Sequence, residues 1–271
     1  MQQFDFIIND LICLNPWRFA IALNTVLIGL VAILPKKLLT TAGLIHAWIL
    51  GVLIWGCLGW LGYVIVAVYF ILGSGVTRIG MAEKEAAGIA ENRGGARGPE
   101  NVWGSALTAT LCAIGIFIIP QLTTSPEIVN SAVSLLGLGY VASFSTKLSD
   151  TCASEVGKAY GKRTFLITTL QPVARGTEGA VSLEGTLAGI IASIIIALIG
   201  WTVGWFDSLG ILWCAIAAFV ATNLESVIGA TIQEQVNWLT NEVVNFINTL
   251  IGAIVAMILA AVWQYSQILL I

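Results

Sequence analysis

Apolar runs of membrane-spanning length dominate the chain, and short polar segments separate them. A membrane-spanning helix needs about 20 mainly apolar residues. Residues 38–78 are almost uninterrupted but too long for one span, so we expect two helices joined by a tight turn near Gly59. The whole pattern predicts eight spans, at about residues 17–34, 38–57, 59–78, 105–120, 129–146, 181–200, 209–228 and 248–270. The predicted fold is therefore all-α, a polytopic helix bundle in which residues 1–271 form one domain.

The positions of proline and of basic residues support this division. All six prolines fall at or outside the predicted span ends. Eleven of the twelve Lys and Arg residues lie in the connections after the first, third and fifth spans, and Arg18 is the exception. Because cytoplasmic loops carry such an excess of basic residues, we expect these polar loops to face the cytoplasm. Both termini are then expected on the opposite side of the membrane.

Composition supports an integral membrane protein and excludes several kinds of site. The hydrophobic share is 58%, whereas soluble domains have roughly 45–50%. We expect a lipid bilayer as partner, no nucleic acid, and no cleavable signal peptide, because the first residues form no basic segment. The five cysteines lack metal-ligand spacing and His46 is the single histidine. A zinc site and a Ser–His–Asp triad are therefore improbable.

The polar stretch 145–161 contains the densest group of candidate functional residues. Lys147, Asp150, Glu155 and Lys158 fall within twelve residues of a chain that is only 10% charged. Two carboxylates can hold a divalent cation, usually Mg²⁺ when phosphates complete its shell. Lysines and open backbone N–H groups can hold those phosphates. The alternative is an ordinary charged loop between two spans.

Two further polar segments lie on the same predicted face. Residues 91–101 combine glycines with Arg93 and Arg97, whose forked donors suit phosphate oxygens. A flexible basic loop beside the membrane is the alternative interpretation. Residues 162–178 extend the first stretch, and Arg175 and Thr177 there are read as another phosphate contact.

Another group of polar residues interrupts the seventh predicted span. Ionisable groups inside spans are costly and usually face a polar interior, so Glu225 is a functional candidate, with a structural hydrogen-bonding role as the alternative. Asparagines then recur at helical spacing at positions 237, 241, 245 and 248. Such a stripe either joins helices through amide hydrogen bonds or lines an active cavity, and the sequence leaves both readings open.

Together these groups favour a membrane-embedded enzyme that moves a phosphoryl or nucleotidyl group onto a lipid-like acceptor. Phosphoryl transfer chiefly needs positioning and neutralisation of charge, which Mg²⁺ and basic side chains supply. A P-loop motif is absent from the sequence. A transporter or flippase of a phosphorylated prenyl lipid is the competing class. It needs polar groups along a whole path across the membrane, whereas this sequence concentrates them on one side.

Several motifs resemble those of a known integral membrane family. They are Asn92-Arg93-Gly94, Ser149-Asp150-Thr151-x-Ala153-Ser154-Glu155-x-Gly157, Gly176-Thr177-x-Gly179-x-Val181-Ser182-x-x-Gly185-Thr186-x-Ala188-Gly189 and Asn223-x-Glu225-Ser226. This pattern is similar to the family that contains the phytyl-phosphate kinases of chloroplasts and cyanobacteria, over about residues 75–252. The second motif is the most specific of the four. A looser likeness connects it with CTP-dependent polyprenol kinases.

The resemblance implies an activity and a set of functional residues. The activity is Mg²⁺-dependent transfer of a phosphoryl group from a nucleoside triphosphate, with CTP favoured, to phytyl or another prenyl monophosphate. Such a reaction belongs to tocopherol synthesis and phytol salvage. Asp150 and Glu155 would hold the metal, and Glu225 would orient a cation or the attacking phosphate. The phosphate contacts would be Asn92, Arg93, Arg97, Lys147, Ser154, Lys158, Lys162, Arg163, Arg175 and Thr177. The prenyl tail is expected between spans, beside Gly185 and Gly189.

Overall fold

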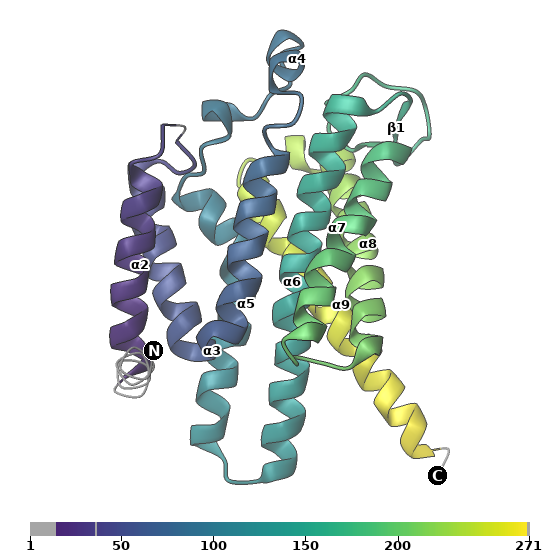
Figure 1. The fold of residues 1–271 in the computed structure, drawn as a ribbon. Helices are drawn as coiled ribbons and strands as arrows, with labels where there is room; N and C mark the ends of the chain where they lie inside the picture. The colour runs from purple at the N-terminus through teal and green to yellow at the C-terminus, as the bar shows by residue number, and fades with distance from the viewer. Residues whose placement is uncertain (1–14, 36, 270–271) are drawn as a thin grey trace.

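The computed structural model of the chain describes residues 15–35 and 37–269, and they form a bundle of long helices (Figure 1). The long helices are α2 (Pro16–Ala32), α3 (Thr41–Val76), α5 (Pro99–Leu122), α6 (Pro126–Tyr160), α7 (Leu183–Thr202), α8 (Ser208–Thr231) and α9 (Asn241–Leu269). Shorter elements are α4 (Met81–Ala86), the 3₁₀ turns η1 (Asn92–Gly95) and η2 (Gln233–Gln235), and the antiparallel strands β1 (Thr164–Leu166) and β2 (Ala180–Ser182). Within the described residues, six helices are long and apolar enough to cross a membrane, and α2 is a shorter apolar helix. The all-α membrane fold is confirmed.

Helix α3 is a helical hairpin, because the chain reverses direction at Gly59. Gly59 has φ 62° and ψ −154°, a conformation that is essentially limited to glycine. Arg97 contacts both halves of α3. Its carbonyl oxygen accepts a hydrogen bond from the Thr40 amide at 3.0 Å, and its guanidinium donates to the Tyr69 hydroxyl at 3.0 Å. The predicted division near Gly59 is therefore correct, and α3 provides two of the expected spans.

Helix α6 corrects the predicted boundary of the fifth span. The hydropathy pattern ends that span at residue 146, but α6 continues without a break to Tyr160. The polar stretch 145–161 is therefore helical over nearly all of its length, and the reading as a charged loop is wrong. Helices α5 and α9 likewise begin earlier than predicted, at Pro99 and Asn241. The reason is the same in each case, because polar side chains that find partners inside the bundle do not end a helix.

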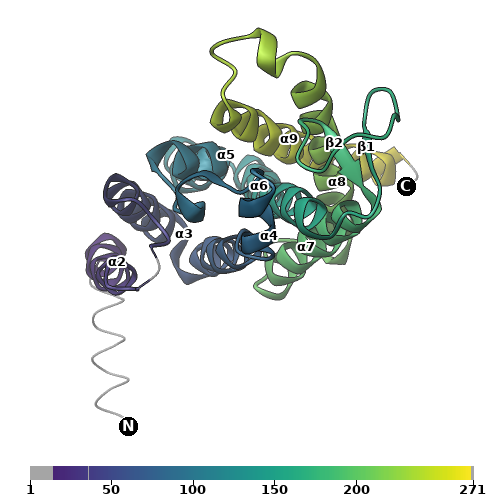
Figure 2. The same ribbon diagram turned by 90° about the horizontal axis from the view of Figure 1, so that it is seen from above.

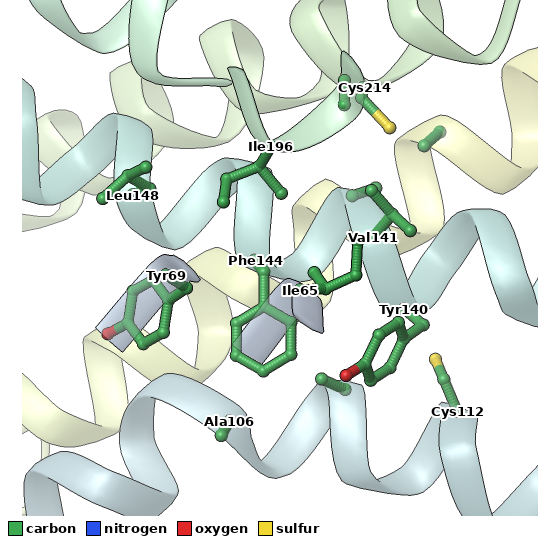
Figure 3. Close-up of a cluster of buried hydrophobic side chains, with 14 of the residues drawn as sticks. Ile65, Tyr69, Ala106, Cys112, Tyr140, Val141, Phe144, Leu148, Ile196 and Cys214 are labelled. Carbon is green, nitrogen blue, oxygen red and sulfur yellow. The ribbon is translucent and has the colours of Figure 1, made fainter. Parts of the chain in front are cut away.

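Helix α6 lies at the centre of the bundle and packs against α3, α5, α7, α8 and α9. Residues 137–152 are all buried, as expected for a helix that is surrounded on every side. Figure 3 shows its aromatic contacts: the Tyr140 and Phe144 rings meet edge to face at 5.4 Å, and Phe144 lies 5.2 Å from Tyr69. The Tyr140 hydroxyl donates to the Gly62 carbonyl at 2.8 Å, so this buried polar group is satisfied.

Glycines bring α7 into close contact with α6. A Cβ atom at Gly189 would lie 2.9 Å from the Ser149 carbonyl oxygen, and one at Gly185 would collide with the Ala153 carbonyl oxygen. Small residues at such positions let membrane helices approach closely. The expectation that Gly185 leaves room for a prenyl tail is therefore wrong, since the α6 backbone fills that space, whereas Gly189 lines the cavity described below.

The polar connections gather at one end of the bundle, which we call the loop end. Helix α4 and strands β1 and β2 lie there, whereas α2 begins and α9 ends at the opposite end (Figure 1). Seen from the loop end, α4 lies beside α6, while β2 contacts α6, α7 and α8 (Figure 2). This arrangement agrees with the single polar face expected from the sequence.

The α6–α7 contact yields a stability prediction. Gly185→Ala places a methyl group against the α6 backbone and should lower the free energy of unfolding by about 1–3 kcal/mol. Gly29→Ala in α2 is the control, because a Cβ there meets nothing within 4 Å. Thermal unfolding of both variants in the same detergent measures the difference. Equal stability of the two variants would show that α6 and α7 are not in contact at Gly185.

Candidate active site

A cavity of about 540 Å³ lies at the loop end, among the ends of α3 and α5–α9. The predicted site residues that line it are Arg97, Lys147, Asp150, Ser154, Glu155, Lys158, Thr177 and Glu225. The structure thus brings together residues from the first polar loop, the 145–161 stretch, the second loop and the seventh span. These segments are far apart in sequence, and the helix ends place them around one space.

Lys147 lies at the inner wall of the cavity in a short buried network. Its ammonium group donates to Asp150 Oδ2 at 2.6 Å and to Asn245 Oδ1 at 2.7 Å. The Lys147 and Asp150 side chains are only 9% and 10% exposed, so each charge depends on its partner. An ammonium group has three N–H donors, which leaves one for a ligand. Asn245 of α9 fixes the direction in which Lys147 points.

Glu155 forms a buried ion pair with Lys84 of α4, a contact that sequence reasoning missed. The two side chains are 2% and 1% exposed, and Lys84 also donates to the Thr77 carbonyl at 2.8 Å. Lys84 lies between Glu83 and Glu85, and nothing in this local sequence pattern indicates a buried partner. The ion pair holds α4 against α6. Glu155 Oε1 has no hydrogen-bond partner in the described part of the chain.

Lys158 lies where the cavity meets the loop end. Its ammonium nitrogen is 3.5 Å from Glu155 Oε1 and 3.6 Å from Glu91 Oε1. Lys158 is therefore the link between α6 and the loop that follows α4. Because its side chain is 24% exposed, it is accessible to a ligand that enters from the loop end.

Arg97 is held at another wall of the cavity. Its guanidinium carbon lies 5.3 Å from the centre of the Tyr69 ring and 5.9 Å from that of Phe70. Contacts of this kind stabilise a cation over an aromatic face. The backbone of Arg97 bonds Leu38 and Thr40, so both the position and the orientation of this cation are fixed before a ligand binds.

Glu225 supplies a carboxylate from α8. It interacts electrostatically with Asp150 and Lys147, and with the loop residue Glu178. Nearby, the Thr222 and Ser149 hydroxyls are 3.4 Å apart and connect α8 to α6. The expectation that the acidic residue of this span faces a polar interior is confirmed by its place in the cavity wall.

The other predicted phosphate contacts either lie outside the cavity or have side chains that the structure does not describe. Lys162, Arg163 and Arg175 are exposed and do not line the cavity. Arg175 instead donates to the Ala159 carbonyl at 3.0 Å. Lys162 and Arg163 lie between α6 and β1, and Arg175 lies in the β1–β2 connection, all on the outer surface of the loop end. The side chains of Asn92 and Arg93 lie outside the described residues, so their role stays a prediction.

The asparagine stripe divides into parts with different positions. Asn241 and Asn245 line the cavity, whereas Asn237 is exposed beyond it. Asn248 lies one turn deeper and is 1% exposed, and its amide has no hydrogen-bond partner among the described residues. Asn241 and Asn245 of the stripe therefore contribute to the cavity, and Asn245 also joins α9 to α6.

The charge of the cavity wall suits phosphate that arrives with a cation. Among the residues whose side chains the structure describes, the charged ones that line it are six acids, Glu91, Asp150, Glu155, Glu178, Glu225 and Glu242, and three cations, Arg97, Lys147 and Lys158. In the described ranges, three or more His, Cys, Asp or Glu side chains nowhere form a metal-holding group. Mg²⁺ is commonly held by one or two carboxylates together with substrate phosphates. The carboxylates of the cavity wall fit a Mg²⁺ ion that the protein and the substrate phosphates would hold together.

Comparison with known proteins identifies the family. The family described as integral membrane protein DUF92 matches residues 24–253. The chain belongs to this family. It is 62% identical over 249 residues to an uncharacterized membrane protein of Synechocystis sp., covering 92% of this chain and 93% of that one. It is 42% identical over 246 residues to Protein VTE6, chloroplastic, of Arabidopsis thaliana, covering 90% and 72%.

A third relative is more distant. An uncharacterized membrane protein of Methanocaldococcus jannaschii is 32% identical over 240 residues, covering 87% of this chain and 92% of that one. No solved structure matches the chain. The resemblance to the integral membrane family with chloroplast and cyanobacterial members is confirmed.

The Lys84–Glu155 pair yields a prediction that separates packing from chemistry. Lys84→Met leaves the Glu155 carboxylate buried without its main partner, which should cost about 3–5 kcal/mol of stability. Adding Glu155→Gln should recover part of that loss. Thermal unfolding in detergent measures both effects, with Lys37→Met as the control because Lys37 is exposed. Unchanged stability of Lys84→Met would contradict the buried ion pair.

Proposed function

We propose that the protein is a membrane-embedded kinase for a prenyl monophosphate. It transfers a phosphoryl group from a nucleoside triphosphate, with CTP favoured, to phytyl or another prenyl monophosphate and gives the diphosphate. The observation that carries this proposal is the cavity at the loop end, where buried acids and fixed cations meet at the ends of membrane helices. Membership of a family with a chloroplast relative supports it.

The proposed reaction needs little proton chemistry. An oxygen of the acceptor phosphate attacks the γ-phosphorus, and the bond between that phosphorus and the β–γ bridging oxygen breaks. The nucleoside diphosphate leaves with that bridging oxygen. Because the acceptor phosphate is already an anion, no strong general base is required. Preorganised cations that neutralise developing charge are the main requirement, and Arg97, Lys147 and Lys158 meet it.

The proposed metal site uses the carboxylates of α6. Asp150 and Glu155 are the proposed ligands, and Glu155 would contribute through Oε1, since Oε2 is engaged by Lys84. Glu225 would orient the cation or the acceptor phosphate from the α8 side. When bound, Mg²⁺ would neutralise the triphosphate. The proposed cytoplasmic orientation of the loop end would give this site access to soluble nucleotide.

The distribution of buried charge supports an enzyme over a transporter or flippase. In the described part of the chain, the buried charged residues are Lys84, Lys147, Asp150 and Glu155. All four lie in the half of the bundle toward the loop end. A flippase moves a charged headgroup through the membrane and needs polar partners along the way. Charged partners are lacking in the interior of the other half of the described bundle.

The proposed function predicts the effect of Asp150→Asn. This substitution keeps the size of the side chain but removes the charge that offsets both Lys147 and the metal. Turnover of phytyl monophosphate should fall by about three decades, since several kcal/mol of transition-state stabilisation are lost. The measurement is transfer of the labelled γ-phosphoryl group by folded protein in detergent, tested with CTP, ATP, GTP and UTP.

The control for this measurement is Glu83→Gln, because Glu83 is exposed on α4. Its turnover should equal that of the unmodified protein. Near-normal turnover by Asp150→Asn would remove Asp150 from the site. No transfer by the unmodified protein with any of the four nucleotides would contradict the kinase proposal itself.

A further inference from the structure

The cavity is lined on one side by residues that belong to the lipid-facing surface. Ile190 of α7 and Phe219 of α8 both line it, and Phe219 is 45% exposed on the outside of the bundle. The exposed apolar residues around them on the same two helices are Leu187, Ile191, Leu212, Ile216 and Leu224. Helices α7 and α8 lie side by side (Figures 1 and 2). The polar cavity is thus continuous with a surface that hydrocarbon chains cover.

The depth of Phe219 places this contact inside the hydrocarbon layer. Phe219 is in the middle of α8, twelve residues before its end at Thr231. At about 1.5 Å per residue, it lies roughly 18 Å below the loop end of α8. The hydrocarbon core of a bilayer is about 30 Å thick. The cavity therefore reaches the membrane interior and is not limited to the aqueous surface.

One face of α8 changes from apolar to acidic along its length. Phe219, Thr222 and Ser226 recur at helical spacing toward the loop end, with Glu225 beside them, and all four line the cavity. The polarity of this face therefore rises in the direction in which the headgroup of a membrane lipid meets water. It matches an amphiphile whose chain lies at Phe219 and whose phosphate lies nearer the loop end.

We propose that α7 and α8 form a lateral entrance for the acceptor, in which its isoprenoid chain passes between Ile190 and Phe219 and stays in the bilayer. This inference rests on the proposed function and adds the route and the mode of chain recognition. The nucleotide enters by a separate opening at the loop end, where Glu91, Lys158 and Thr177 line the cavity and are accessible to water.

The lateral entrance has a consequence for specificity. Most residues that line the cavity are polar, charged or small, and the larger apolar ones there are few: Ile89, Val181, Ile190 and Phe219. In the described part of the cavity wall, a long isoprenoid chain therefore meets no closed apolar pocket that could recognise its far end. The entrance recognises the first part of the chain, and acceptors that differ only in the length beyond it should have similar KM values.

Photo-crosslinking tests the route without depending on turnover. A benzophenone amino acid is placed at Phe219, and as a matched control at Leu212, an exposed position two turns away on the same face of α8. The full-length protein in nanodiscs is irradiated with radiolabelled phytyl monophosphate. The expected result is labelling at position 219 that geranylgeranyl monophosphate competes away and excess phosphatidylglycerol does not, with weak labelling at 212.

Two outcomes would overturn the entrance. Equal labelling at 219 and 212 would mean that the chain contacts the surface without a preferred route. Competition by phosphatidylglycerol would mean that the position binds membrane phospholipid instead. Because the readout is binding, specific labelling without phosphoryl transfer would contradict the kinase proposal and keep the entrance. Phosphoryl transfer without specific labelling would contradict the entrance and keep the kinase proposal.

A kinetic arm uses a substitution that narrows the entrance. Ile190→Trp should raise the KM for phytyl monophosphate about tenfold relative to the KM for dimethylallyl monophosphate, whose chain is much shorter and needs less of the entrance. Leu212→Trp, on the lipid-facing surface outside the cavity, is the control and should leave that ratio unchanged. An unchanged ratio in folded Ile190→Trp protein would contradict the entrance.

Discussion

Charge inside the central helix is the constraint on which the rest of the structure depends. Helix α6 places Lys147, Asp150 and Glu155 at buried positions, and an unpaired charge there would cost several kcal/mol. Each charge therefore fixes a neighbour. Asn245 ties α9 to α6, and Lys84 ties α4 to it. The same contacts that stabilise the helix end also set the shape of the cavity.

These pairs also explain how a rigid site for phosphate could exist at a membrane surface. Lys147 and Arg97 are oriented by a carboxylate, an amide and an aromatic ring before any ligand is present. Orientation in advance avoids the cost of reorganising dipoles during a reaction. Among the described residues of the wall, acids outnumber cations, and a ligand that brings positive charge with it would balance that surplus. A metal-bound polyphosphate has that property.

The sequence predicted the spans well because hydropathy and the reversal at Gly59 are local properties. It failed where partners are distant. Lys84 and Glu155 are separated by 71 positions, and Lys147 and Asn245 by 98. No local pattern shows that such residues meet. Hydropathy alone therefore ends the fifth span at residue 146, just before the buried Lys147. Gly185 leaves no room for a prenyl tail for a related reason, since a small side chain leaves room only if no backbone fills it.

The sequence predicts the chemical type of the candidate site but not the full set of residues that form it. Asp150, Glu155, Lys158 and Glu225 all reach the cavity, because they sit on helix faces or ends that meet there. Lys162 and Arg163, just before β1, and Arg175, in the β1–β2 connection, do not, because their side chains are exposed on the outside of the loop end. Charge and spacing alone could not distinguish a basic residue on a helix from one on a strand connection.

A structure of the protein in nanodiscs with a non-hydrolysable nucleoside triphosphate, Mn²⁺ in place of Mg²⁺ and phytyl monophosphate tests the central claim most directly. The predicted result is a triphosphate in the cavity within hydrogen-bonding distance of Lys147 and Lys158, with the metal bound by Asp150. A nucleotide bound outside the cavity, or an empty cavity at saturating ligand, would contradict the assignment of this site to phosphoryl transfer.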